Sequence, residues 1–195
     1  MYQVPNNTQN LNFIRLRKGI SKEAGMTFIE VLIALFIMAT GIFGAIAMQA
    51  TAKKASFDAM QRSLASSLAQ DIVERMRNND SANLDLYATN SPYGSGKIAT
   101  SPTCNTTTAL CTPTQMVVHD LFGWEQSLMG AGVIDGANNI GGLIGGIGCI
   151  GVNGNEVTVV VTWQGRAKHA DSNKAAGCGT ASEGRRQVVI NAFII

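Results

Sequence analysis

Residues 25–48 read GMTFIEVLIALFIMATGIFGAIAM, and from Val31 to Met48 the run contains no charged residue. Counted from Phe28, the run has 21 residues and one interruption, Glu30. A bilayer core needs about 20 apolar residues in helical form. A buried helix of a soluble protein is the alternative, but such a helix rarely runs this long without a polar face. The sequence therefore predicts a transmembrane helix over about residues 28–48.

The helical pattern continues beyond the apolar run. Apolar residues recur three or four positions apart, with polar and charged residues between them on the other side. This apolar stripe comprises Phe57, Met60, Leu64, Leu68, Ile72 and Met76. No Pro or Gly lies between Ala45 and Arg77, and residues 78–81 (NNDS) form a stop signal. We expect one continuous helix from about Thr27 to Asn79, apolar all round in its first half and amphipathic in its second.

Basic residues are concentrated ahead of the apolar run. Residues 1–25 carry a net charge of +3, so the other 170 residues carry −1 of the total of +2. Because segments rich in Lys and Arg stay in the cytoplasm, we expect a cytoplasmic N-terminus and an exported remainder. The charged content of 14% also argues against a disordered polyelectrolyte and against a nucleic-acid binder driven by bulk charge.

Glu30 is the unusual residue of the apolar segment. A carboxylate in hydrocarbon costs about 2 kcal/mol or more and is usually retained for a partner. The alternative is that Glu30 lies close enough to the interface for its side chain to reach water. Its surroundings favour a functional role, because the sequence KEAG (residues 22–25) stands directly before MTFIEVL (residues 26–32).

This arrangement resembles the class III signal of type IV pilins and of type II secretion pseudopilins. In those proteins a short basic leader ends in Gly, and a prepilin peptidase cuts on the cytoplasmic side before the apolar helix. The resemblance implies cleavage between Gly25 and Met26 and methylation of the new amino group of Met26. It also implies that Glu30 pairs with that amino group on a neighbouring subunit and sets the register of assembly.

The resemblance implies a type IV pilin fold of the α+β class, with a long N-terminal helix packed on a C-terminal antiparallel sheet. Residues 1–25 would be a cleaved cytoplasmic leader, residues 26–80 the long helix, and residues 81–195 a periplasmic or extracellular globular domain. The chain departs from the major pilins in two ways and resembles minor pilins in the first: Met26 replaces the usual Phe, and no Pro lies within the span. The implied partners are prepilin peptidase, other minor pilins and the major pilin, bound through their N-terminal helices. The implied location is the bacterial inner membrane, then the pilus filament or its tip.

Two other functions remain open from the sequence. One is a minor pseudopilin of a type II secretion system, which shares the opening motif. The other is a single-pass receptor or adhesin with an uncleaved anchor. A contribution to adhesion is also compatible with the pilin interpretation.

The segment after residue 80 is expected to be irregular up to Pro113. We then predict a short strand over Met116–His119 and a helix capped by Asp120, with Leu121, Trp124 and Leu128 on one face. Residues 130–154 contain ten Gly and are expected to form turns. The clearest strand signals are EVTVVVTWQ (156–164) and the C-terminal segment 186–195, which we expect to pair in an antiparallel sheet over the helix stripe.

Four cysteines in an exported domain favour two disulfides. The short spacing between Cys104 and Cys111 favours that pair, which leaves Cys149 with Cys178, although the other two connectivities remain open. A zinc site is disfavoured because no C-x-x-C or His pair exists.

No cofactor, metal or enzymatic activity is expected. His119 and His169 are the only histidines, and neither lies in a recognisable catalytic motif, although Asp171 and Ser182 follow His169 in the sequence. A nucleic-acid partner is not expected either, since the chain lacks a basic aromatic strip.

Overall fold

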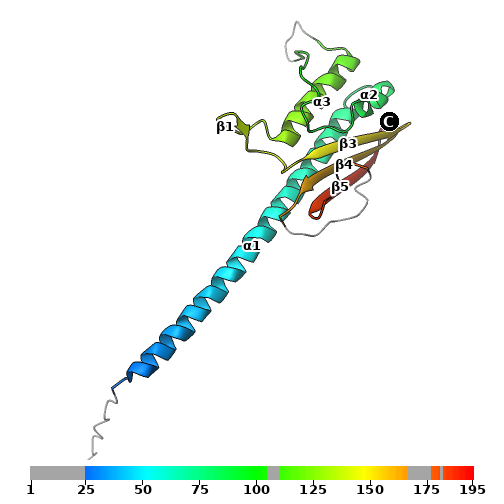
Figure 1. Cartoon of the computed structure of the whole chain (residues 1–195). Coiled ribbons are helices and arrows are strands. Elements are labelled where there is room, and N and C mark those ends of the chain that lie inside the picture. Colours follow the sequence, from blue (N-terminus) through cyan, green and yellow to red (C-terminus); the bar gives the residue numbers. More distant parts are fainter. Residues whose placement is uncertain (1–24, 105–109, 167–176, 181) are drawn as a thin grey trace, which may run out of the picture. The chain divides into compact units, whose positions relative to one another are not determined.

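The structure is a computed structural model that describes residues 25–104, 110–166, 177–180 and 182–195 (Figure 1). The chain divides into two compact units, one ending at Ala45 and the other comprising Ile46–Ile195. We describe each unit by itself.

Helix α1 spans Phe28–Arg77, so the predicted continuous helix is confirmed. Its residues up to Ala45 belong to the first unit and are all exposed. In the second unit, the amphipathic half of α1 buries one face, comprising Gln61, Ala65, Leu68, Ala69, Ile72, Val73 and Met76. The expected stripe is therefore correct from Leu64 onward, since Leu64 is partly buried and packs against the core, whereas Met60 remains mostly exposed.

The larger sheet of the second unit has three antiparallel strands in the order β3-β4-β5. These are β3 (Ile147–Asn153), β4 (Glu156–Gln164) and β5 (Arg185–Phe193). Strands β4 and β5 confirm the two strand predictions and their antiparallel pairing. Strand β4 is central, and four of its side chains, Val157, Val159, Val161 and Trp163, belong to the same apolar core as the buried face of α1.

Strand β3 corrects the expectation that residues 130–154 form only turns. Glycine is required at position 148 of this strand because Trp124 occupies the space where a side chain would lie. Two shorter strands, β1 (Ile134–Asp135) and β2 (Asn138–Asn139), pair with each other ahead of β3.

Helix α3 spans Pro113–Met129 and corrects the predicted strand over Met116–His119. Thr112, not Asp120, caps this helix, and Gln115 completes a capping box with it. Asp120 instead lies buried in the middle of the helix. Segment 81–113 is also more regular than expected, because it contains a 3-10 turn (η1, Ser81–Asn83) and helix α2 (Leu84–Ala88).

Helix α3 packs against the amphipathic half of α1 through the indole of Trp124, which donates to the carbonyl oxygen of Leu68 at 2.8 Å. Trp124 is fully buried and makes an edge-to-face contact with Tyr93, with ring centroids 5.6 Å apart. One continuous core therefore joins α1 from residue 65, α2, α3 and the sheet.

Candidate functional site

The first candidate site lies at the beginning of the described part of the first unit. Gly25, Met26 and Thr27 precede α1, and the carbonyl oxygen of Thr27 accepts hydrogen bonds from the N–H groups of Glu30 (3.1 Å) and Val31 (3.3 Å). Met26 is 72% exposed, and the position of a Cβ on Gly25 has no heavy atom within 4 Å. Gly25 and Met26 on both sides of the peptide bond are thus exposed.

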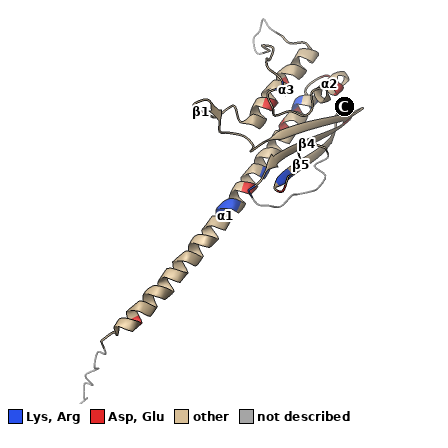
Figure 2. Cartoon of the chain, in the orientation of Figure 1, with Lys and Arg blue, Asp and Glu red and all other residues tan. Residues whose placement is uncertain are grey.

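Glu30 lies in the first turn of α1. A carboxylate is favourable there because unpaired N–H groups and the helix dipole make the N-terminus electropositive. Glu30 is exposed, and among the described residues its side chain has no hydrogen bond or ion pair. Figure 2 shows an acidic position near the start of α1, followed by a long stretch of the helix without acidic or basic residues. In the sequence, no charged residue lies between Glu30 and Lys53.

The helix surface around and after Glu30 is apolar and uncovered. Every residue from Phe28 to Met48 is exposed, and α1 is the single helix among the described residues that is long and apolar enough to cross a membrane. Burying this surface is strongly favourable, at about 25 cal/mol per Å² of apolar area. None of the described residues covers this surface.

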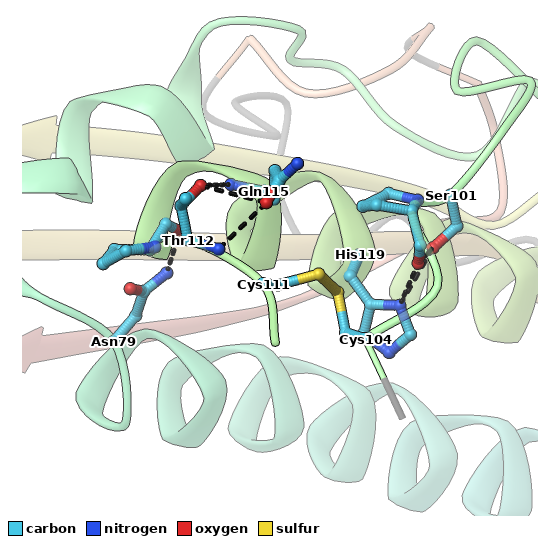
Figure 3. Close-up of a disulfide and its surroundings, with 9 residues drawn as sticks. Asn79, Ser101, Cys104, Cys111, Thr112, Gln115 and His119 are labelled. Atoms are coloured by element: carbon cyan, nitrogen blue, oxygen red, sulfur yellow. Dashed lines mark hydrogen bonds between the residues drawn. A yellow bond between two sulfur atoms is a disulfide. The ribbon is translucent and has the colours of Figure 1, made fainter. Parts of the chain in front are cut away.

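The second unit contains both disulfides that the cysteine spacing favoured, Cys104–Cys111 and Cys149–Cys178. The first lies beside α3, next to His119 and the capped N-terminus of that helix (Figure 3). The second links β3 to the segment before β5.

Of the residues weighed for catalysis, the structure describes His119 and Ser182, and their hydrogen bonds within the described residues go to other groups and not to each other. His119 contacts Ser101 Oγ at 2.9 Å and the carbonyl oxygen of Pro102 at 3.2 Å through Nδ1, as Figure 3 shows for Ser101. Ser182 Oγ donates to Gln164 Oε1 at 2.7 Å. His169 and Asp171 lie outside the described residues. Within the described part of the chain, no three His, Cys, Asp or Glu side chains form a group that could hold a metal ion.

The sequence did not predict that the carboxylates of Asp120 and Glu125 are buried. Asp120 accepts a hydrogen bond from the Tyr87 hydroxyl at 2.8 Å and lies 3.5 Å from a guanidinium nitrogen of Arg75, so it ties α3 to α2 and α1. Glu125 accepts hydrogen bonds from five consecutive backbone N–H groups of residues 94–98, at 2.9–3.2 Å. The only available signal was that Glu125 adjoins Trp124 on the same helix.

Two protein-family models match the chain. The prokaryotic N-terminal methylation motif matches residues 20–46, and a model described as type IV pilin Tt1218 matches residues 47–122. The two matches are contiguous and cover all of α1, α2 and most of α3. No curated protein and no solved structure matches the chain.

Proposed function

Because the chain is a type IV pilin-like protein, we propose that it is a minor pilin of the type IV pilus, similar to the pilus modification protein PilV. In this role it takes part in initiating or building the filament and contributes to adhesion at the filament tip. Before assembly it lies in the bacterial inner membrane, with its N-terminus in the cytoplasm.

One observation carries the proposal: an uncovered apolar helix with a single carboxylate two residues inside its start. Such a surface is stable in lipid, and it is equally stable in a bundle of similar helices. The transfer from lipid to bundle therefore loses little hydrophobic stabilisation. Glu30 would distinguish the two environments, because only the bundle can offer it a cationic partner.

The proposed partner of Glu30 is created by processing. Prepilin peptidase hydrolyses the Gly25–Met26 bond, and the amino group thus released on Met26 is methylated. Since Gly25 and Met26 precede the helix and are exposed, the bond is accessible to an enzyme. A methylated ammonium keeps its charge and so can pair with Glu30 of a neighbouring subunit. Because removing both charges from water costs free energy, such a pair adds little to the stability of the filament. Its main effect is to fix the axial register of neighbouring subunits.

Replacing Glu30 tests this function. We expect Glu30→Ala to insert in the membrane and to be processed, but to be missing from filaments sheared off the cells. Glu74→Ala is the matched control, since Glu74 is an exposed carboxylate near the other end of α1 that pairs with Arg77 at 2.6 Å. Immunoblots of cell and sheared fractions measure both variants. Equal incorporation of Glu30→Ala and wild type would contradict the proposal.

The N-terminal residue of the sheared protein separates the alternatives. Mass spectrometry should find methylated Met26 in filaments. An intact Met1 would indicate the anchored receptor or adhesin instead. A processed chain that is absent from surface pili but required for protein secretion would indicate a type II pseudopilin.

A further inference from the structure

Strand β5 leaves one side of the sheet open. All nine of its residues pair with β4, and on its other side it pairs with no strand among the described residues. An edge strand presents unpaired N–H and C=O groups at the spacing that another strand needs. Val189, in the middle of β5, is 45% exposed.

A groove of about 610 Å³ lies between this edge and α1. On the strand side it is lined by Gln187, Val188 and Val189, and on the helix side mainly by short side chains, Ala59, Ser63 and Ser66, together with Arg62. Short side chains leave room for a polypeptide backbone. The groove lies entirely within the second unit.

The groove continues into a second pocket of about 230 Å³, which shares Ala59 and Arg62 with it and is also lined by Asp58, Trp163 and Arg186. Together the lining residues run from 58 to 66 on α1 and from 186 to 189 on β5. At 1.5 Å per helical residue and about 3.4 Å per strand residue, these stretches span about 12 Å and about 10 Å. An extended segment of about four or five residues therefore fits the combined groove.

Trp163 gives the pocket an unsatisfied donor. Its side chain is 1% exposed, and its Nε1–H has no hydrogen-bond partner among the described residues. The other indole of the chain, that of Trp124, donates to Leu68. A buried donor without an acceptor is destabilising, and a bound acceptor would remove that cost.

The charges around Trp163 favour a carboxylate as that acceptor. Trp163 pairs across the sheet with Arg186, whose guanidinium lies 3.7 Å from Asp58, and Arg62 lines the same pocket. Arg62 lines both pockets, and its side chain has no hydrogen bond or ion pair with another described residue. A carboxylate bound there would accept charge-assisted hydrogen bonds from its guanidinium.

We propose that this groove binds an extended, acidic segment of another protein chain by strand addition to β5, with a carboxylate of that segment held by Arg62 and Trp163. A helix is a poorer occupant, because its backbone groups are already paired and cannot complete a strand edge. Every pairing in this sheet is antiparallel. An antiparallel segment would bring its C-terminal end to Arg186, where the acidic residue is required. The inference depends on the second unit alone and is independent of the role proposed for Glu30.

The NMR resonances of the Trp163 and Trp124 indoles test the proposal. The full chain, labelled with ¹⁵N-tryptophan and held in detergent micelles, is titrated with the acetylated and amidated peptide TVTVE. We expect the indole resonance of Trp163, assigned with Trp163→Phe, to shift while that of Trp124 stays in place. The peptide TVTVQ should bind about fivefold more weakly, since it lacks the charge. Amide hydrogen exchange of β5 should slow when TVTVE is bound.

Arg62→Ala should weaken binding of TVTVE about fivefold, whereas Lys54→Ala should not. Lys54 is a matched control because it is an exposed cation on the same helix that lines neither pocket. Equal effects of the two variants, equal shifts of both indoles or equal binding of TVTVE and TVTVQ would each overturn the proposal. Concentration-dependent protection of β5 without any peptide would also overturn it, in favour of a second copy of this chain.

Discussion

The carboxylate of Glu125 accepts a hydrogen bond from the backbone N–H of Gly94 at 2.9 Å, although the two residues lie 31 positions apart. The same oxygen accepts from the next three N–H groups, and the second oxygen accepts from Ile98. Glu125 is fully buried. One side chain of α3 therefore fixes the loop that leads away from the Tyr93–Gly148 bridge to the sheet.

Glu125→Gln should destabilise the chain by about 2 kcal/mol. The amide of Gln keeps one acceptor, but its NH₂ group must face backbone donors and leaves at least one buried N–H unsatisfied. Urea unfolding of the full chain in detergent, followed by tryptophan fluorescence, measures the loss. Glu156→Gln is the control, since Glu156 is exposed on β4, and it should change the free energy of unfolding by less than 0.5 kcal/mol, roughly the spread of surface substitutions.

The carboxylate of Glu125 should also make the free energy of unfolding depend on pH. Burial raises the pKa of Glu125, but the backbone N–H groups that it accepts from outweigh this and hold its pKa below the ordinary value of 4.5. A depressed folded-state pKa stabilises the protein at pH values above the unfolded pKa, and this contribution is lost as the pH falls through the folded value. We expect the unfolding free energy of the wild type to fall as the pH drops below about 4.5. Glu125→Gln should show a shallower fall, and identical slopes for the two proteins would contradict this account.

The sequence predicted those elements whose pattern is local. The segment up to Arg77 has no Pro or Gly after Ala45, and this pattern alone predicts a helix. The β-branched residues of β4 likewise predict a strand. Helix α3 was partly misread because Met116–Val118 resembles a strand, whereas its start depends on the capping box of Thr112 and Gln115. The tertiary contacts were not predictable. Trp124 fills the space where a side chain at Gly148 of β3 would lie, and nothing in the sequence around Glu125 shows that a distant loop supplies its donors.

Gly148→Ala should test the packing of β3 against α3. A Cβ at this position would lie 2.3 Å from Cη2 of Trp124 and 2.9 Å from Cδ1 of Leu128. Both side chains are fully buried, so relieving the overlap should cost about 1–3 kcal/mol. Gly151→Ala is a control on the same strand, because its Cβ would approach nothing closer than 4.0 Å. Thermal unfolding should show a lower Tm for Gly148→Ala alone, and similar Tm values for the two variants would refute the close contact.

The two disulfides should contribute unequally to stability. Cys149–Cys178 joins residues 29 positions apart, and Cys104–Cys111 joins residues 7 positions apart. The loop-entropy relation gives about 3.6 and about 2.4 kcal/mol for loops of these lengths. Cys178 is also fully buried. The double variant Cys149→Ala, Cys178→Ala should therefore unfold at lower urea concentration than Cys104→Ala, Cys111→Ala, and the reverse order would contradict the prediction.

The proposed processing step should depend on Gly25 because a peptidase must approach the backbone closely on the amino side of the bond it cuts. A branched side chain there would obstruct this approach, whereas glycine offers no Cβ. We expect Gly25→Val to remain at full length in membranes, with the 25-residue leader still attached, and to be absent from sheared filaments. Gly41→Ala is the control, since a Cβ at Gly41 meets no atom within 4 Å and the residue lies well inside the apolar helix. It should be processed normally. Mass spectrometry of the N-terminal peptide distinguishes a chain that begins at Met1 from one that begins at methylated Met26, and normal processing of Gly25→Val would exclude the proposed cleavage site.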